Sequence, residues 1–100
     1  MQSLWIQLLV RFKAFGTIRQ HLGEKILEVD VPENSSVFDV IQTIVEHGNP
    51  SLRELIFEKG EVSGNLIVIL NKKDVSTIGG MRITVNEGDE IALLPHVQGG

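Results

Sequence analysis

The sequence predicts an α+β domain in which a mixed sheet of about four to five strands packs on one main helix. Three features of the chain predict this fold. Near the N-terminus apolar residues alternate with other residues, which is the period-two pattern of a strand. The middle of the chain carries an apolar stripe with helical spacing, and short apolar runs of the strand type follow it. The length of 100 residues suits a single domain with one modest core.

The first strand is predicted over residues 4–13, where alternate residues form one apolar face: Leu4, Ile6, Leu8, Val10 and Phe12. The spacing then becomes helical, because Phe15, Ile18 and Leu22 lie three and four residues apart. Gly23 can close a helix in the left-handed conformation. A short helical turn is therefore expected directly after the first strand.

A second strand is predicted over residues 27–31. Leu27, Val29 and Val31 alternate there with Glu28 and Asp30. Pro32 ends this strand, because proline has no N–H to donate to a ladder. Since the two strands are close in sequence, they are expected to pair antiparallel.

The clearest helix of the sequence follows the second strand. Its apolar stripe is formed by residues with helical spacing: Val37, Val40, Ile41, Ile44 and Val45. Ser36 and Asp39 have the spacing of a capping box at its start. Gly48 suits the C′ position, and Pro50 prevents the helix from continuing. Packed on a sheet, this stripe supplies most of the second layer of the core.

The elements after the main helix are shorter. Asn49 and Pro50 can begin a second short helix. Residues 58–64 are expected to form a polar loop. The unbroken apolar run over residues 66–70 predicts a strand that is covered on both faces or nearly so. Residues 71–74 are expected to form the turn after this strand.

One further strand, at an edge of the sheet, is weakly indicated by Ile83 and Val85. The acidic segment over residues 87–89 follows it. Gly88 lies in this segment, and glycine alone takes a positive φ without steric cost, so a tight turn is predicted there. The acidic residues of this turn are most simply solvated loop charges, and they could also complement a basic partner.

The last strand is predicted over residues 91–94. Leu93 and Leu94 must point to opposite faces of it, so one can be core while the other is exposed. Pro95 stops the strand. The remaining segment holds one apolar side chain and ends in two glycines, so it has too little to bury to order itself. The sequence thus predicts a domain over residues 1–94 and a flexible arm over residues 95–100.

The end of this arm indicates that the C-terminal carboxylate is a functional group. Fully extended, the arm reaches roughly 20 Å. A carboxylate is a poor electrophile and must be activated, for instance as an acyl-adenylate, before a nucleophile attacks it. Gly99 and Gly100 give the narrowest backbone for entry into a confined, ATP-bearing site. A terminal Gly-Gly also arises by chance, and the two residues alone leave both interpretations open.

A longer pattern at this end resembles a known family. Glu87-Gly88-Asp89-Glu90-Ile91, then Leu93-Leu94-Pro95 and a terminal Gly99-Gly100, is similar to the tail of the ubiquitin-like sulfur carriers of the MoaD/ThiS type. The segment from Phe15 through Arg19 to Gly23 is also similar to the segment that follows the first strand in that family. The chain departs from the family tail at His96, where a second proline is usual; this loosens the arm and adds a titratable group.

The resemblance implies a β-grasp fold, in which the last strand lies parallel to the first in the centre of the sheet. It also implies that an E1-like enzyme uses ATP to adenylate Gly100, and that sulfur then displaces AMP to leave a thiocarboxylate. The arm would insert into a larger subunit, which takes the sulfur into a cofactor precursor, most simply molybdopterin. The expected partner-binding residues are those around the arm: Leu94, Pro95, His96, Val97, Gln98 and Gly99. The chain would bind no cofactor itself and catalyse nothing alone.

Two alternatives remain open at this point. The activated Gly100 could be passed to lysine side chains, which would make the chain a protein modifier. The chain could instead be a ubiquitin-like interaction module whose sheet face binds a partner and whose tail is inert. The free Gly-Gly end distinguishes a carrier or modifier from a pure binding module, because the binding module does not need such an end. Molybdopterin, thiamine and tRNA sulfuration are not distinguished by the sequence.

Composition restricts the chemistry further. The absence of cysteine removes disulfides, thiolate metal sites and a cysteine nucleophile, so any sulfur must be carried on the C-terminal carboxyl group. The net charge of −4 argues against nucleic acid or anionic lipid as a partner. The sequence shows neither a membrane-spanning run nor a signal peptide, so a cytoplasmic protein is expected. The three histidines have no ligand spacing, and no metal site is expected.

Overall fold

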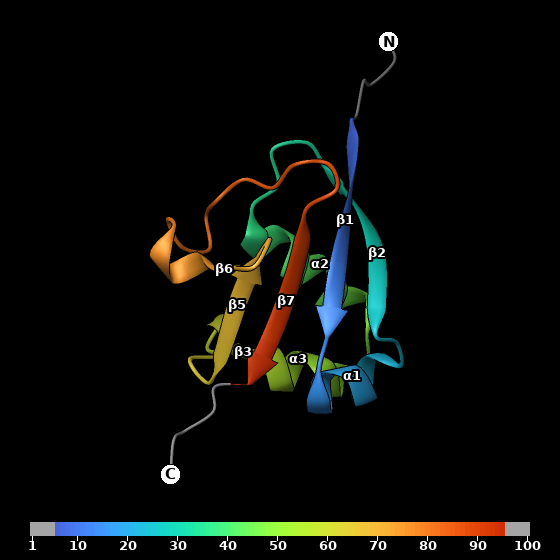
Figure 1. The fold of residues 1–100 in the computed structure, drawn as a ribbon. Coiled ribbons are helices and arrows are strands. Elements are labelled where there is room, and N and C mark those ends of the chain that lie inside the picture. The colour runs from blue at the N-terminus through green and yellow to red at the C-terminus, as the bar shows by residue number, and fades with distance from the viewer. Residues whose placement is uncertain (1–5, 96–100) are drawn as a thin grey trace.

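The computed structural model describes residues 6–95 and shows a five-stranded mixed sheet with the helices on one of its faces (Figure 1). The elements follow one another in this order: β1 (Gln7–Ala14), α1 (Gly16–Leu22), β2 (Ile26–Pro32), α2 (Val37–His47), α3 (Pro50–Ile56), β3 (Phe57–Glu58), β4 (Glu61–Val62), β5 (Leu66–Leu70), β6 (Lys73–Asp74), a 3-10 turn (Val75–Thr77) and β7 (Glu90–Pro95). The strand order across the sheet is β2-β1-β7-β5-β6. β7 is parallel to β1 and antiparallel to β5 in the centre of the sheet, so the predicted β-grasp arrangement is confirmed.

The period-two pattern near the N-terminus forms β1, which pairs antiparallel with β2 as predicted. Val10 and Phe12 are fully buried on the helix side. Ile6, which was expected on the same apolar face, precedes the strand and is 54% exposed. Ile6 lies just beyond the paired residues Gln7 and Pro32, and its side chain is not part of the core. Leu4 lies outside the described residues.

Two predicted helix ends are confirmed, namely the end of α1 and the start of α2. Gly23 ends α1 with φ of 85°, and its N–H donates to the Arg19 carbonyl oxygen at 2.8 Å. Ser36 and Asp39 form the capping box of α2, in which each side chain accepts a hydrogen bond from the other residue's backbone N–H. The whole predicted stripe of α2 is buried: Val37, Val40, Ile41, Ile44 and Val45.

Gly48 ends α2 for a different reason from the one its sequence position indicates. Its φ of −91° is ordinary, so it does not form the left-handed cap that glycine favours at a helix end. A Cβ on Gly48 would lie 2.5 Å from Cδ2 of Leu52, a fully buried residue of α3. Glycine therefore allows α3 to pack closely against the end of α2. The expected start of α3 is confirmed, since the Asn49 side chain accepts a hydrogen bond from the Leu52 N–H at 3.0 Å.

Three expectations for the second half of the chain are corrected. The loop over residues 58–64 contains part of a small antiparallel hairpin of β3 and β4. The turn over residues 71–74 ends in β6, which pairs with β5 at the edge of the sheet. β5 is covered on its helix face only: Val68 and Leu70 are buried there, while the alternate residues Ile67 and Ile69 on the opposite face stay half-exposed.

The predicted edge strand at Ile83 and Val85 is wrong. This segment lies along the start of α2, where the Val37 N–H donates to the Ile83 carbonyl oxygen at 2.9 Å. The Val85 N–H donates to the Ser35 carbonyl oxygen at 2.9 Å, and the Val85 side chain is buried. The segment thus supplies an acceptor to an amide of the first helical turn, which has no acceptor within the helix.

Among the described helices, none is long and apolar enough to cross a bilayer.

Candidate functional site

The turn before β7 attaches the last strand to the first one. Gly88 has φ of 83°, as the predicted tight turn requires, and its N–H donates to the Leu9 carbonyl oxygen at 2.8 Å. The Leu9 N–H donates in return to Oε1 of Glu87 at 2.9 Å. These two bonds hold the start of β7 beside β1.

The acidic residues of this turn are more than solvated charges. Asp89 accepts hydrogen bonds from the Asn71 side-chain amide at 2.9 Å and from the Asn86 N–H at 2.7 Å. The Asn71 side-chain oxygen accepts from the Glu90 N–H at 2.9 Å. The Glu90 carboxylate lies 3.3 Å from the Lys13 ammonium group. The turn is therefore bonded to β1 on one side and to the end of β5 on the other.

The side chains of β7 alternate between the two faces of the sheet, as its sequence predicts. Ile91 and Leu93 are fully buried in the core. Leu94 points to the opposite face, where it is half-buried and lies across from Ile67 of β5. No helix covers that face of the sheet within residues 6–95 (Figure 1), so Leu94 is available there for contact with a partner.

The chain leaves the sheet at Pro95, the last residue of β7, which pairs with Leu66. The strand thus ends one residue later than predicted, at the end of the sheet near α1 and α3 (Figure 1). The described residues include two of the predicted partner-binding residues, Leu94 and Pro95. The others lie outside the described residues: His96, Val97, Gln98, Gly99 and the expected reactive residue Gly100.

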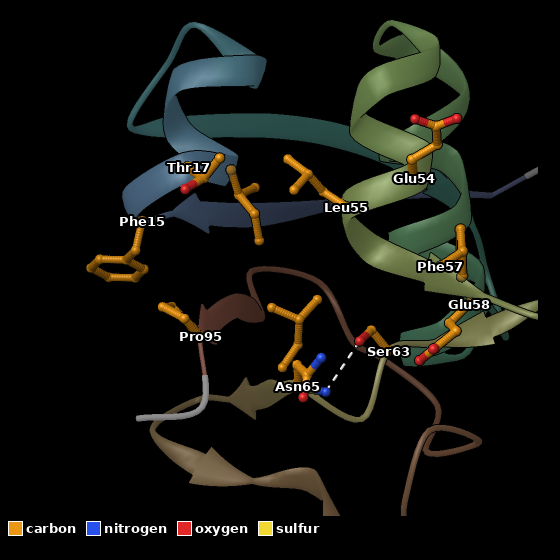
Figure 2. A pocket seen from close by; sticks show the side chains of 11 residues that line it. Phe15, Thr17, Glu54, Leu55, Phe57, Glu58, Ser63, Asn65 and Pro95 are labelled. Carbon is orange, nitrogen blue, oxygen red and sulfur yellow. Dashed lines mark hydrogen bonds between the residues drawn. The ribbon is translucent and has the colours of Figure 1, made fainter. Parts of the chain in front are cut away.

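A pocket of about 410 Å³ lies beside Pro95. Figure 2 shows it between α1, α3, the end of β7 and the start of β5. Its lining combines apolar, uncharged polar and acidic residues: Phe15, Thr17, Ile18, Glu54, Leu55, Phe57, Glu58, Ser63, Asn65, Leu66 and Pro95. Glu54 and Glu58 are exposed, and no lysine or arginine is part of the lining. The sequence analysis did not identify this pocket.

One signal in the sequence points to this pocket in retrospect. Phe15 occupies the N-cap position of α1, where serine, threonine, aspartate or asparagine would accept a hydrogen bond from the helix. Phe15 makes no such bond, and its half-buried ring lines the pocket instead. Phe15 therefore contributes to the pocket and does not cap α1.

Three other titratable groups of the described residues have local hydrogen-bond partners: His21, His47 and Asp74. Nδ1 of His21 and of His47 lies within 2.9 Å of a carbonyl oxygen in its own helix. The Ser76 N–H and hydroxyl group both donate to Asp74 at the start of the 3-10 turn, and they hold the pKa of Asp74 below its usual range. Within residues 6–95 no three histidine or acidic side chains are grouped so that they could hold a metal ion.

The family model of the ThiS family matches residues 12–100 of the chain. The chain is 30% identical to small archaeal modifier protein 3 of Haloferax volcanii, over 95% of this chain and 100% of that protein. It is 28% identical to a candidate sulfur carrier protein of Archaeoglobus fulgidus, over 74% of this chain and 83% of that protein. The solution structure of small archaeal modifier protein 1 of Methanosarcina acetivorans is similar with a TM-score of 0.81, at 27% identity, over 95% of this chain and 99% of that one.

Proposed function

The chain belongs to the ThiS family, and from this membership we propose that it is a sulfur carrier whose Gly100 carboxyl group is activated with ATP. An E1-like adenylating enzyme is the proposed catalyst. A carboxylate oxygen of Gly100 attacks the α-phosphorus of ATP, pyrophosphate leaves, and an acyl-adenylate forms. The terminal sulfur of an enzyme persulfide then attacks the acyl carbon, and AMP leaves. A second thiol cleaves the sulfur–sulfur bond, which leaves a thiocarboxylate on Gly100 and a disulfide on the donor.

The observation that carries this proposal is the placement of β7. The strand lies in the centre of the sheet, bonded to β1 and β5, and Pro95 ends it where the five residues to Gly100 begin. The C-terminal residues thus follow a strand that is paired on both sides. A rigid body that ends in a short segment with a terminal Gly-Gly suits delivery of a carboxyl group into another protein's active site.

The proposed sulfur acceptor is a molybdopterin precursor, with the chain acting as the small subunit of a molybdopterin synthase. The segment from Glu87 to Gly100 is similar to the tails of such subunits, and it fits the other sulfur carriers of the MoaD/ThiS type equally well. In this role the chain is a co-substrate: the larger subunit supplies the catalytic groups and the chain supplies sulfur. The absence of cysteine is consistent with sulfur carried at Gly100 alone.

A second candidate function is conjugation of Gly100 to lysine side chains. Two relatives of this chain, at 30% and 28% identity, bear the name small archaeal modifier protein. The first step is the same, because a lysine amine also needs an activated acyl group. The two functions differ in the nucleophile that attacks the activated acyl carbon of Gly100. This nucleophile is a sulfur atom in a sulfur carrier and a lysine amine in a protein modifier.

Both functions require adenylation of Gly100, whereas an interaction module with an inert tail does not, so adenylation distinguishes them from such a module. The chain is incubated with ATP and the E1-like enzyme of the same genome, and release of pyrophosphate is measured. We expect release with the natural chain and none with a chain extended by one alanine after Gly100. Equal reaction of the extended chain would mean that the free carboxyl group of Gly100 is not the reactive group, and the interaction-module interpretation would then replace the proposal.

A further inference from the structure

We propose that the pocket beside Pro95 is a docking site for an apolar side chain flanked by lysine or arginine, contributed by the enzyme that activates Gly100. This inference rests on the proposed function. It assigns a partner contact to α1 and α3, on the helix side of the domain. Of the two expected partner-binding residues that the structure describes, Pro95 lines this pocket, whereas the residues of α1 and α3 were not expected to bind a partner.

The pocket has the size and lining of a site for a side chain. Its volume of about 410 Å³ lies in the range of pockets that bind small molecules, roughly 300–1,000 Å³, so the pocket has room for a side chain. Phe15, Leu55 and Phe57 are each only half-buried, although they are large apolar residues. Figure 2 shows Leu55 and Pro95 on opposite sides of the space, with Asn65 at its lower edge. An apolar group placed between them would cover the surface that these residues leave exposed.

The charges at the pocket favour a cation. Glu54 and Glu58 are both exposed, and neither forms an ion pair with another residue of the described part of the chain. Two guanidinium groups lie over aromatic rings of the lining: Arg19 is 5.7 Å from the centre of the Phe15 ring, and Arg53 is 5.9 Å from that of Phe57. The carboxylates are therefore free to attract a basic residue beside the apolar group.

The chain's own C-terminus does not suit this pocket. The residues after Pro95 include one aliphatic side chain, Val97, and they end in a carboxylate that Glu54 and Glu58 repel. Burial of one valine would contribute only about 1.5–3 kcal/mol to such a contact. A second copy of the chain is disfavoured as well, because each copy carries a net charge of −4 and presents the same acidic pocket.

The position of Pro95 identifies the partner as the enzyme that receives the C-terminus. Pro95 lines the pocket and is also the last residue before the segment that ends at Gly100. That segment spans at most about 18 Å when it is fully extended. Any active site that holds Gly100 therefore belongs to a protein whose surface comes close to the pocket, and a basic, apolar contact there adds affinity without touching the reacting atoms.

The test is the dependence of the adenylation rate on the concentration of the chain. Glu54→Lys combined with Glu58→Lys reverses both charges at exposed positions. Glu33→Lys combined with Glu46→Lys is the matched control, with the same change in net charge at exposed residues that do not line the pocket. We expect the pocket variant to raise KM by about tenfold or more with kcat within about twofold, while the control changes both by less than about twofold.

A second measurement uses binding without chemistry. The chain extended by one alanine after Gly100 serves as a competitive inhibitor of the adenylation of the natural chain. We expect the Glu54→Lys, Glu58→Lys variant with the same extension to inhibit this reaction about tenfold less well. Leu55→Gln, which removes the apolar wall, is expected to raise KM in the same way, with a thermal melt to show that it is folded. A KM equal to that of the control for both pocket variants would overturn the inference.

Other occupants have distinct outcomes. If Val97→Ser shifts the NMR amide signals of the pocket residues in the free chain, its own C-terminal segment occupies the pocket and the inference is wrong. If the natural chain sediments as a dimer that the double charge reversal dissociates, a second copy is the occupant and the inference is again wrong. Absence of adenylation of the natural chain overturns the proposed function itself, whereas normal adenylation of the pocket variants overturns only this inference.

Discussion

The Leu9 N–H donates a hydrogen bond of 2.9 Å to the Glu87 carboxylate, which joins residues 78 positions apart in the chain. With the bond from the Gly88 N–H to the Leu9 carbonyl oxygen, it fastens the turn before β7 to the middle of β1. Parallel strands cannot be joined by a short hairpin, so their register needs contacts of this kind. The register that places Glu90 beside Arg11 follows directly from this turn.

Glu87→Ala should therefore destabilise the domain, although the residue is exposed. Loss of the bond to the Leu9 N–H is expected to lower the free energy of unfolding by about 0.5–1.5 kcal/mol, the usual net contribution of such a bond. Glu87→Gln keeps a side-chain oxygen acceptor and should lose less. Denaturant melts of both variants measure the difference, with Glu61→Ala as an exposed control. Equal stability of Glu87→Ala and Glu61→Ala would show that the bond does not hold β7.

Local patterns in the sequence predicted the helices and strands that bury one of their faces in the core. The stripe of α2 and the capping box at Ser36 formed as expected, and the alternation in β1 formed a strand that buries Val10 and Phe12 but not Ile6. The segment at Ile83 and Val85 shows where such patterns fail. Two alternate apolar residues fit an edge strand, but they also fit a segment packed along a helix start, and only the position of α2 selects the second arrangement.

Gly48→Ala is a second stability prediction, and it concerns packing rather than backbone freedom. The new Cβ would lie 2.5 Å from Cδ2 of Leu52, so this buried side chain must move within the core. We expect a loss of about 1–3 kcal/mol in the free energy of unfolding, as for other overpacked cores. Gly64→Ala is the matched control, because a Cβ there meets nothing within 4 Å and the φ is not positive. A chemical melt that shows the same small change for both variants would contradict the proposed role of Gly48.

The pKa of Asp74 gives a prediction about pH. The Ser76 N–H, and secondly its hydroxyl group, bond the charged carboxylate and hold the pKa of Asp74 below its usual range. Folding thus favours the charged form, and this contribution to stability is present at neutral pH and is lost as the pH falls through the lowered pKa. An NMR titration should place the pKa of Asp74 below that of an aspartate in an unstructured peptide. Ser76→Ala should raise the pKa only part of the way, because the backbone N–H remains; an unchanged pKa in this variant would contradict a role for the hydroxyl group.

The candidate site shows a similar division between what could and could not be predicted. The residues that carry the proposed chemistry are consecutive in sequence, so the end of the chain identifies them without a structure. The pocket is assembled from α1, α3, β5 and β7, and Phe15, Leu55 and Asn65 come together only through the order of the strands and helices. The same holds for Glu87 and Asp89, whose partners Leu9 and Asn71 lie far away in sequence.

Sulfur at the C-terminus can be detected directly by mass. Protein isolated from its native cell should include a fraction in which one oxygen of the C-terminal peptide is replaced by sulfur. Because the chain has no cysteine, no side-chain persulfide adds sulfur to any of its peptides. The measurement is mass spectrometry of the C-terminal peptide under sulfur-replete conditions. Finding only the unmodified peptide and lysine-linked adducts would favour the modifier function over the sulfur carrier.

Gly99→Ala should separate stability from function. The residue lies four positions beyond Pro95, outside the strand, so we expect the free energy of unfolding to change by no more than about 0.5 kcal/mol. In the proposed active site of the activating enzyme, a Cβ at this position would enter a channel that fits bare backbone, and a positive φ would become costly. A shift of the terminus by about 1 Å can lower a rate on the order of 10²-fold, and we expect a loss of that size in adenylation. The measurement pairs a denaturant melt with the rate of pyrophosphate release, and Gln98→Ala serves as a control that adds no Cβ. A normal melt together with a normal rate for Gly99→Ala would mean that the terminal glycines have no role in activation, and the interaction-module interpretation would then be favoured.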